Sequence, residues 1–325
     1  MSERYLRPID IKHHPLTTHQ YMLPTASIDT FMSRVKRLIR NHTPGAIVYA
    51  DPRVGKTYAI RYVKNALREE YPGVVCLSWG TESKVKPSEE AFFTTLLEAA
   101  SHPEALKGNS TPKRRRLVER LTELVDGSDY NWFLMFTDEA QRLGMIEYEW
   151  LRDVHDVLER KGIRMITLLV GQPDLLNQKS AFRQSKQTQI VLRFMVSEMR
   201  FDGLSDPDGL ATCLQGYDDA IFPDGSDWTY TRFFLPRAYE TGLRLVDQAA
   251  LIWAAFRRAD IQAGLVVPAE IPMQYFAHTV EIALESNMDK DAADFTFTAA
   301  MWDEAIKESF YSNALEEMYK GMPSN

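Results

Sequence analysis

One segment restricts the possible folds of this chain more than any other: residues 50–57, which read Ala-Asp-Pro-Arg-Val-Gly-Lys-Thr. They follow an apolar run at 46–49 and precede a segment with helical spacing that starts near Tyr58. A strand, a tight turn ending in Gly-Lys-Thr and a helix form a phosphate-binding loop, in which backbone N–H groups and the positive helix N-terminus surround the phosphates. The sequence therefore predicts a nucleoside triphosphate site, with ATP as the first candidate.

Each residue type in this loop has an expected task. Lys56 supplies a point charge to the β- and γ-phosphates, and Thr57 offers its hydroxyl to Mg²⁺. Ala50 stands where the motif usually has glycine, a departure that weakens the match only slightly. An ordinary surface turn is the alternative interpretation. The predicted nucleotide-binding residues are Ala50, Asp51, Pro52, Arg53, Val54, Gly55, Lys56 and Thr57.

Two carboxylates follow a second apolar run, at residues 132–137. We expect Asp138 to hold the Mg²⁺ shell, and Glu139 to polarise the water that attacks the γ-phosphate. The alternative is that the pair caps the helix that follows, because Asp favours such positions. The upstream phosphate loop favours the catalytic interpretation.

Three further polar residues are candidates for the same site. Gln172 follows the apolar run at 166–170 and is placed to bind phosphate or the attacking water, although a turn residue before proline needs no function. Arg193 lies in a predicted fifth strand, and Arg244 at the head of a predicted long helix. A guanidinium can grip phosphate oxygens in two places, but either arginine could equally pair with surface carboxylates.

The order of apolar patterns predicts an α/β fold with a five-stranded parallel sheet flanked by helices, followed by an all-helical part. Predicted strands lie at 46–49, 74–79, 132–137, 165–170 and 189–195, and the later helices at 207–215, 243–263, 271–285 and 298–319. We expect three parts: an arm and amphipathic helix at 1–43, a nucleotide-binding domain at 44–202, and helices at 203–325. Residues 1–25 are polar and aperiodic, which favours an extended arm over a packed element.

Composition narrows the class of protein. The 325 residues are 45% hydrophobic and carry a net charge of −7, so any nucleic-acid contact must come from a local basic patch. The runs 34–40 and 113–116 are the candidates, with solvated helix faces as the alternative. Cys76 and Cys213 are isolated and expected to be core thiols. Neither a membrane span nor a secretory signal is visible, so we expect a cytoplasmic protein.

Four short motifs carry a resemblance to a known family. After the phosphate loop come Asp-Glu-Ala-Gln at 138–141, Gly-Gln-Pro at 171–173, Arg-Phe at 193–194 and Gly-Leu-Arg at 242–244. This order resembles an AAA+ ATPase over residues 46–263. Within that superfamily, the chain is most similar to bacterial transposition regulators of the TnsC, TniB and MuB type and to their ExeA-like relatives. The resemblance implies a P-loop AAA+ domain followed by a helical lid.

The resemblance also implies a role for each matching residue. Lys56 and Thr57 fall on the Walker A positions, Asp138 and Glu139 on Walker B, Gln172 on sensor 1, and Arg244 on the sensor 2 arginine of the lid. Arg193 corresponds to an arginine finger that reaches the neighbouring subunit's site, and Arg183 is its rival. A finger that acts in trans implies a ring or helical filament of identical subunits.

By the same resemblance, the expected partners are double-stranded DNA and a transposase or other recombination protein, and none is a membrane. The insertion between the second and third strands is where such regulators face DNA. Its cations are Lys84, Lys86, Lys107, Lys113, Arg114 and Arg115. The expected function is a DNA-binding ATPase that selects a transposition target and recruits a transposase. Two alternatives remain: an AAA+ motor of replication or secretion, and a nucleotide-gated assembly module with little turnover.

Overall fold

The computed structural model describes residues 6–265 and 269–319. Contacts along the chain divide it into two compact units, which we describe separately. The sheet unit comprises residues 28–52 and 56–201. The helical unit comprises the described parts of 1–27 and 202–325, and the three loop residues 53–55 are grouped with it.

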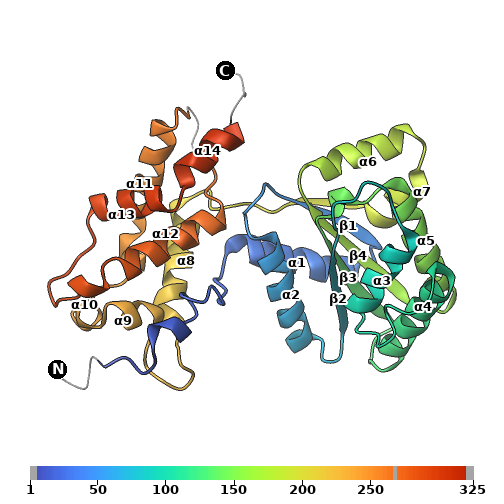
Figure 1. Cartoon of the computed structure of the whole chain (residues 1–325), viewed down its shortest axis with the longest axis horizontal. Helices are drawn as coiled ribbons and strands as arrows, with labels where there is room; N and C mark the ends of the chain where they lie inside the picture. Colours follow the sequence, from blue (N-terminus) through green and yellow to red (C-terminus); the bar gives the residue numbers. More distant parts are fainter. Residues whose placement is uncertain (1–5, 266–268, 320–325) are drawn as a thin grey trace. The chain divides into compact units, whose positions relative to one another are not determined.

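The sheet unit is built on five parallel strands in the order β2-β3-β4-β1-β5 (Figure 1). Their bounds are β1(Gly45–Tyr49), β2(Val75–Gly80), β3(Trp132–Asp138), β4(Arg164–Gly171) and β5(Ser197–Arg200). Strand β3, which lies between β2 and β4, is buried from Trp132 to Thr137, which explains its unbroken apolar run. The predicted α/β fold class is confirmed.

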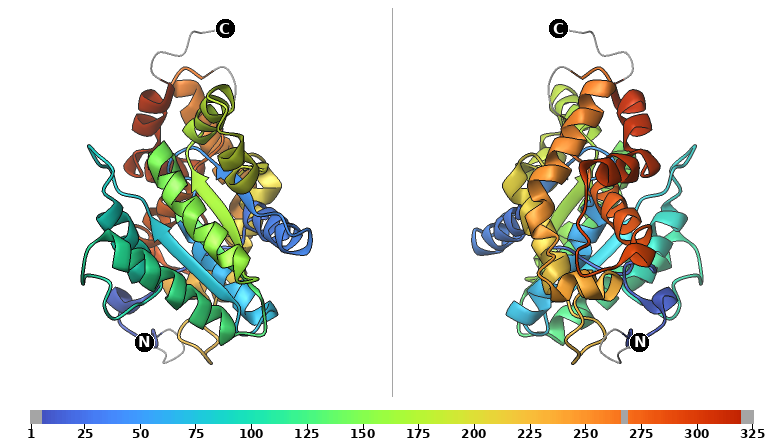
Figure 2. Two further views of the ribbon diagram at one scale, coloured as in Figure 1. Left: turned by 90° about the vertical axis from the view of Figure 1, so that its right-hand side faces the viewer. Right: turned by 90° about the vertical axis from the view of Figure 1, so that its left-hand side faces the viewer.

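Helices cover both faces of this sheet, as Figures 1 and 2 show. They are α1(Ala26–Arg40), α2(Lys56–Glu70), α3(Glu89–Ala99), α4(Ser110–Asp126), α5(Met145–Arg160), α6(Asp174–Gln184) and α7(Thr188–Phe194). On one face, Phe133 and Met135 join a core with residues of α3 to α7. On the other face, Phe31 of α1 meets Phe136 edge to face. Alternation along β3 sends neighbouring side chains to these two cores.

The predicted fifth strand at 189–195 is wrong. Residues 188–194 form helix α7, and the fifth strand is β5 at 197–200. Ile190, Val191 and Phe194 are buried while Leu192 is 64% exposed, which is the spacing of a helix with one apolar face. The run is short enough that its apolar content alone does not separate a strand from a helix.

The helical unit contains seven helices among the described residues. They are α8(Pro207–Asp219), α9(Tyr230–Phe234), α10(Pro236–Glu240), α11(Ala249–Gln262), α12(Met273–Glu285), α13(Ala299–Glu308) and α14(Tyr311–Tyr319). Two expected helices differ from the prediction. The helix expected at 243–263 begins only at Ala249, after a short 3₁₀ turn, and the one expected at 298–319 is broken at Phe310, where φ is 60°.

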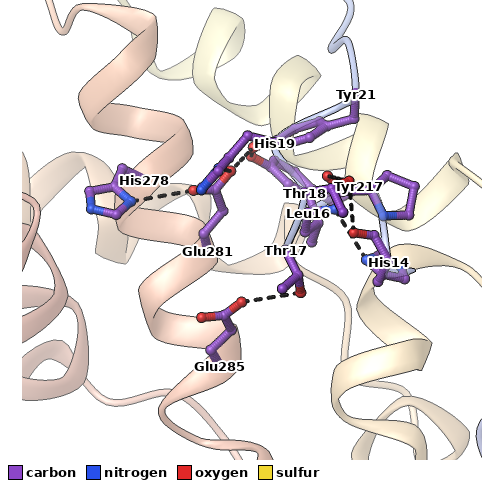
Figure 3. Close-up of polar contacts among 11 residues, drawn as sticks. His14, Leu16, Thr17, Thr18, His19, Tyr21, Tyr217, His278, Glu281 and Glu285 are labelled. Atoms are coloured by element: carbon purple, nitrogen blue, oxygen red, sulfur yellow. Dashed lines mark hydrogen bonds and ion pairs between the residues drawn. The ribbon is translucent and has the colours of Figure 1, made fainter. Parts of the chain in front are cut away.

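The N-terminal arm is packed into the helical unit, which corrects the expectation of an extended segment. Leu16 and His14 are fully buried, and Leu23 is 7% exposed. Figure 3 shows Thr17 reaching Glu285 of α12, and Tyr21 donating its hydroxyl to Glu281 of the same helix at 2.7 Å. The segment from 6 to 25 therefore packs on the helical unit and contributes Leu16 and Leu23 to its core.

His14 is the most enclosed polar group of the arm. Its ring stacks on Phe233 with a centroid distance of 4.3 Å, and its Nδ1 accepts a hydrogen bond from Leu16 N. Its Nε2 has no hydrogen-bond partner among the described residues. Burial lowers the pKa of His14 to about 4, because a charged imidazole would lose its hydration there.

This burial predicts a loss of stability in mild acid. Since the pKa of His14 is lower in the folded chain than in the unfolded one, the unfolded state takes up the proton first as the pH falls. We expect the free energy of unfolding to drop by up to about 3 kcal/mol between pH 6.5 and 4, at about 1.4 kcal/mol per pH unit. Urea unfolding at several pH values measures this, and His14→Phe should flatten the slope while substitution of the exposed His13 by Ala should not. Equal slopes in all three chains would contradict the assignment.

No helix among the described residues is long and apolar enough to cross a membrane. Cys76 and Cys213 are buried free thiols, as expected. The division into parts at 1–43, 44–202 and 203–325 stays a prediction.

Candidate nucleotide-binding site

The predicted phosphate loop connects the end of β1 to the start of α2, which begins at Lys56. Two of its residues have left-handed backbone angles, with φ of 66° at Arg53 and 105° at Gly55. Glycine adopts such an angle without strain, so Gly55 suits the tight turn before the helix. The N-terminus of α2 thus lies at the end of the loop, where its backbone N–H groups can bind phosphate.

Lys56 is enclosed by the loop that precedes it. Its Nζ donates hydrogen bonds to the carbonyl oxygens of Ala50, at 3.0 Å, and Asp51, at 2.8 Å, and the residue is 7% exposed. Burial lowers the pKa of the Lys56 ammonium, and the carboxylates of Glu139, Asp138 and Asp51 oppose that shift. The ammonium thus lies within the field of the acidic pair at the end of β3.

Thr57 and Asp138 meet directly. The Thr57 hydroxyl donates to Asp138 Oδ2 at 2.6 Å, and Asp138 Oδ1 accepts from Glu139 N at 3.0 Å. A hydroxyl and a carboxylate side by side are the oxygen ligands that Mg²⁺ prefers, so these residues fit that ion. The structure therefore brings together the two predicted magnesium ligands, from α2 and β3.

Glu139 has an unusual backbone conformation. Its φ of 54° and ψ of 35° are left-handed, which costs free energy for a residue with a Cβ atom. Its carboxylate accepts from Gln141 Nε2 at 2.9 Å and lies 3.5 Å from the guanidinium of Arg142. Strain of this kind clusters at functional sites, which supports a functional interpretation of Glu139.

Gln172 follows β4 at the same edge of the sheet. Its N–H donates to Gln141 Oε1 at 3.1 Å. Within the described part of the chain, its own side-chain amide makes no hydrogen bond, and it is half-buried. The amide is thus free to bind a ligand. Gln141 and Arg142 were not predicted as site residues, although Gln141 belongs to the Asp-Glu-Ala-Gln motif.

The two candidate finger arginines differ in their surroundings. Arg193 lies in α7, where its guanidinium is 2.7 Å from Asp156 and 3.8 Å from Glu159 of α5. Arg183, near the end of α6, is exposed and has no ion pair or hydrogen bond from its side chain to any described residue. Arg193 is thus held within its own subunit, whereas Arg183 is free to contact another chain.

Arg244 lies in the helical unit, in the connection before α11 rather than at the head of a long helix. Its guanidinium stacks 3.7 Å from the ring centroid of Tyr239 and donates to the carbonyl oxygens of Tyr239 and Leu243. Buried Asp218 fixes this connection by accepting hydrogen bonds from Leu245 N and Val246 N. The predicted sensor role of Arg244 stays a prediction.

Most of the predicted DNA-facing cations are paired within the sheet unit. Lys113 is 2% exposed and held by Glu90 and Thr94, so it is not available to a DNA phosphate. Arg114 pairs with Glu89 and Asp153. The remaining pairs are Lys84 with Glu147, Lys107 with Glu104 and Arg115 with Glu119. Lys86 is exposed without a partner among the described residues.

The other basic run, on α1, has two cations without such partners. Arg37 and Arg40 are exposed and make no ion pair with any described carboxylate, whereas Lys36 pairs with Glu70. Arg34 donates to the carbonyl oxygen of Glu198. Positive charge is therefore less neutralised on α1 than on α4.

Comparisons with known proteins identify the class of the fold. A family model described as an AAA domain matches residues 39–178. The ORC2 protein of Aeropyrum pernix, solved with ADPNP and ADP, is similar in structure with 15% identity and a TM-score of 0.59, covering 91% of this chain and 72% of that one. Its ADP form gives 14% identity and a TM-score of 0.57, covering 93% and 77%. Drosophila ORC bound to DNA gives 11% identity and 0.52, covering 100% and 73%.

These likenesses are of fold, since all three identities are low. Together with the family model, they show an AAA+ P-loop fold: a five-stranded parallel sheet with flanking helices and a helical C-terminal part. No curated protein matches the sequence. The finer resemblance to transposition regulators stays a prediction.

Proposed function

We propose that this chain is an ATP-hydrolysing, DNA-binding oligomer that regulates transposition by selecting a target site and recruiting a transposase. The observation that carries the ATPase part is the contact of Thr57 with Asp138 beside the enclosed Lys56. The order of the four short motifs supports the transposition part.

The residues divide the work of hydrolysis between them. Lys56 neutralises phosphate charge, and Thr57 and Asp138 would hold Mg²⁺, which when bound shields the phosphate oxygens. Glu139 orients the attacking water and accepts its proton, while Gln172 donates a hydrogen bond from its free amide. Each of these side chains comes from the carboxyl edge of the sheet or the adjoining helix, where ligands of open α/β sheets bind.

A complete site also needs a cation from a second subunit. We propose Arg183 for this role because it is exposed and unpaired among the described residues, whereas Arg193 is tied to Asp156. ATP would then stabilise the ring or filament, since its phosphates are bound from both sides of the subunit contact.

The two arginines make a testable contrast. Arg183→Ala should lower ATP turnover of the assembled protein by about tenfold, as expected for one lost charge-assisted contact, and leave the melting temperature unchanged. Arg193→Ala should lower the free energy of unfolding by about 1 kcal/mol, because it breaks a half-exposed ion pair. Steady-state turnover and thermal melts measure both effects.

A mixing experiment separates action in trans from action in cis. Arg183→Ala subunits mixed with Glu139→Gln subunits should regain turnover, because some contacts then join an intact Arg183 to an intact Glu139. If the mixture assembles but stays inactive, while a mixture made with Arg193→Ala recovers, Arg193 is the finger instead.

DNA binding is proposed through the exposed cations, chiefly Arg37 and Arg40 of α1, with Lys86 and the Glu119-paired Arg115 as weaker contacts. Of the similar structures, Drosophila ORC is described as bound to DNA. Exposed cations without carboxylate partners can neutralise phosphates at little cost, whereas paired ones must first give up their partners. Such contacts are independent of sequence.

The experiment that tests this function combines assembly, DNA and salt. With a non-hydrolysable ATP analogue, the protein should bind duplex DNA of arbitrary sequence and form rings or filaments in electron micrographs. Its affinity for the DNA should fall steeply with rising salt concentration. Arg37→Glu with Arg40→Glu should reduce both the affinity and the salt slope. Lys86→Glu with Arg115→Glu is the matched comparison and should reduce both quantities less, because Arg115 is already paired with Glu119. An affinity for DNA that depends neither on nucleotide nor on salt concentration would overturn the proposal.

Replication initiation is a second candidate, favoured by the names of the similar structures, which are ORC proteins. At 11–15% identity this likeness is of fold alone. A neighbouring gene for an RNase-H-like transposase would favour transposition. A direct test is whether the DNA-bound protein stimulates the activity of a purified transposase. The third alternative is an assembly module with little ATP turnover. A very low rate of ATP hydrolysis by the DNA-bound protein would favour it.

A further inference from the structure

One side chain connects the acidic end of β3 to the end of β4. Gln141 lies on the short 3₁₀ turn Ala140–Arg142 that follows Glu139. Its Nε2 donates to Glu139 Oε2 at 2.9 Å, and its Oε1 accepts from Gln172 N at 3.1 Å. Only one orientation of the amide satisfies both partners, because the carboxylate needs a donor and the N–H needs an acceptor.

Gly171 provides the space for this bridge. A Cβ atom added at Gly171 would lie 2.2 Å from Gln141 Oε1 and 2.9 Å from Leu175 Cδ1. Real Cβ atoms do not approach oxygen so closely, so any larger residue at 171 would displace the Gln141 amide or the turn that carries it. The glycine is therefore required by contact rather than by backbone angle, since its φ is not positive.

The carboxylate that Gln141 holds is one of three that act on the Lys56 ammonium. Glu139 is the foremost of the carboxylates that act on the Lys56 ammonium, ahead of Asp138 and Asp51. Arg142 lies 3.5 Å from the same carboxylate and is half-exposed, so it is the weaker of the two restraints. A free glutamate side chain would otherwise sample several rotamers at this turn.

We propose that Gln141 is a positioning residue for ATP hydrolysis, which fixes the carboxylate of Glu139 and the backbone of Gln172 in one rigid unit. The proposal rests on the function proposed above. In this role Gln141 acts through Glu139 and Gln172 rather than on the substrate itself. It acts by setting the distance between the group that accepts the proton of water and the loop that carries the Gln172 amide.

The first test separates turnover from binding. Gln141→Leu keeps the size of the side chain but removes both hydrogen bonds, so kcat should fall about tenfold while KM stays within about twofold, since ATP binding does not use Gln141. Gln178→Leu is the matched control: this half-buried amide also makes two hydrogen bonds, with Tyr148 Oη and the carbonyl oxygen of Leu143, and does not contact Glu139. An unchanged kcat in Gln141→Leu, or an equal loss in Gln178→Leu, would overturn the proposal.

The second test uses Gly171. Gly171→Ala should reproduce the kcat defect by displacing the amide, and should cost little further activity in a Gln141→Ala chain, where the collision with the amide is gone. Additive losses in the double variant would show that Gly171 and Gln141 act independently, against the proposal.

The third test needs no hydrolysis. In thermal melts of the nucleotide-free protein, Glu139→Ala should shift the melting temperature by different amounts in the wild-type and Gln141→Leu backgrounds, because the two residues share a hydrogen bond. Equal shifts in the two backgrounds would show that Gln141 and Glu139 are not coupled, against the proposed bridge. If the wild-type chain does not hydrolyse ATP, even when bound to DNA, the proposed function is wrong. These melts would still show whether Gln141 holds Glu139.

Discussion

A chain with Glu139→Gln is expected to bind ATP as tightly as the wild type and to hydrolyse it about 10²- to 10⁴-fold more slowly, the contribution typical of a general base. The amide has the same shape as the carboxylate but cannot accept the proton of the attacking water. It can still accept the hydrogen bond from Gln141, so the geometry of the turn should persist. Single-turnover phosphate release measures the rate, and a fluorescent nucleotide titration measures the affinity.

The control for this change is a second glutamate of the same unit. Glu149 pairs with Arg152 on α5, at 2.6 Å. Glu149→Gln should leave turnover within about twofold of wild type, since a half-exposed pair contributes little. Equal rates for the wild-type and Glu139→Gln chains would remove Glu139 from the reaction.

Lys56→Ala is expected to weaken ATP binding by about 100-fold or more. Loss of charge-assisted hydrogen bonds to phosphate costs about 3 kcal/mol in all, and about 1.4 kcal/mol corresponds to tenfold in affinity. The chain should still fold, because burial already disfavours the ammonium in the nucleotide-free protein. Calorimetric titration with ATP, together with a thermal melt of the same sample, separates lost binding from lost folding.

Lys64 supplies the matched control for this second change. It lies on the same helix α2, is half-buried, and donates to Ser78 Oγ at 2.7 Å rather than to the loop. Lys64→Ala should keep its ATP affinity. If the two alanine variants bind ATP equally well, the loop does not bind phosphate through Lys56.

Secondary structure was predicted correctly where the local sequence pattern was strong. The first four strands were predictable because their apolar runs end in turn residues, and Thr57 and Asp138 were predictable because the motif fixes their spacing from those strands. Their contact at 2.6 Å brings together two segments that the sequence separates by 81 positions.

Other features depend on tertiary packing, which short patterns do not encode. Residues 188–194 look apolar enough for a strand, but they form a helix that packs against β1, α5 and α6. The arm looked extended because its many polar residues hide the signal of buried ones such as His14, Leu16 and Leu23. The role of Gln141 could not be predicted, although the residue belongs to the Asp-Glu-Ala-Gln motif, since that role depends on the end of β4 lying beside it.

The route of the chain through its two units affects how it is made. The helical unit is discontinuous, with the sheet unit inserted between its first segment and the rest. Arg7 contacts the carbonyl oxygen of Phe233, 226 positions later, so at about 5–20 residues per second a ribosome needs about 10–45 s to deliver that partner. Leu16 and Leu23 are made long before their partners in the later helices, and the sheet unit, which ends at residue 201, is completed before the helical unit. Slower elongation or a shortage of chaperones should therefore harm the helical unit first.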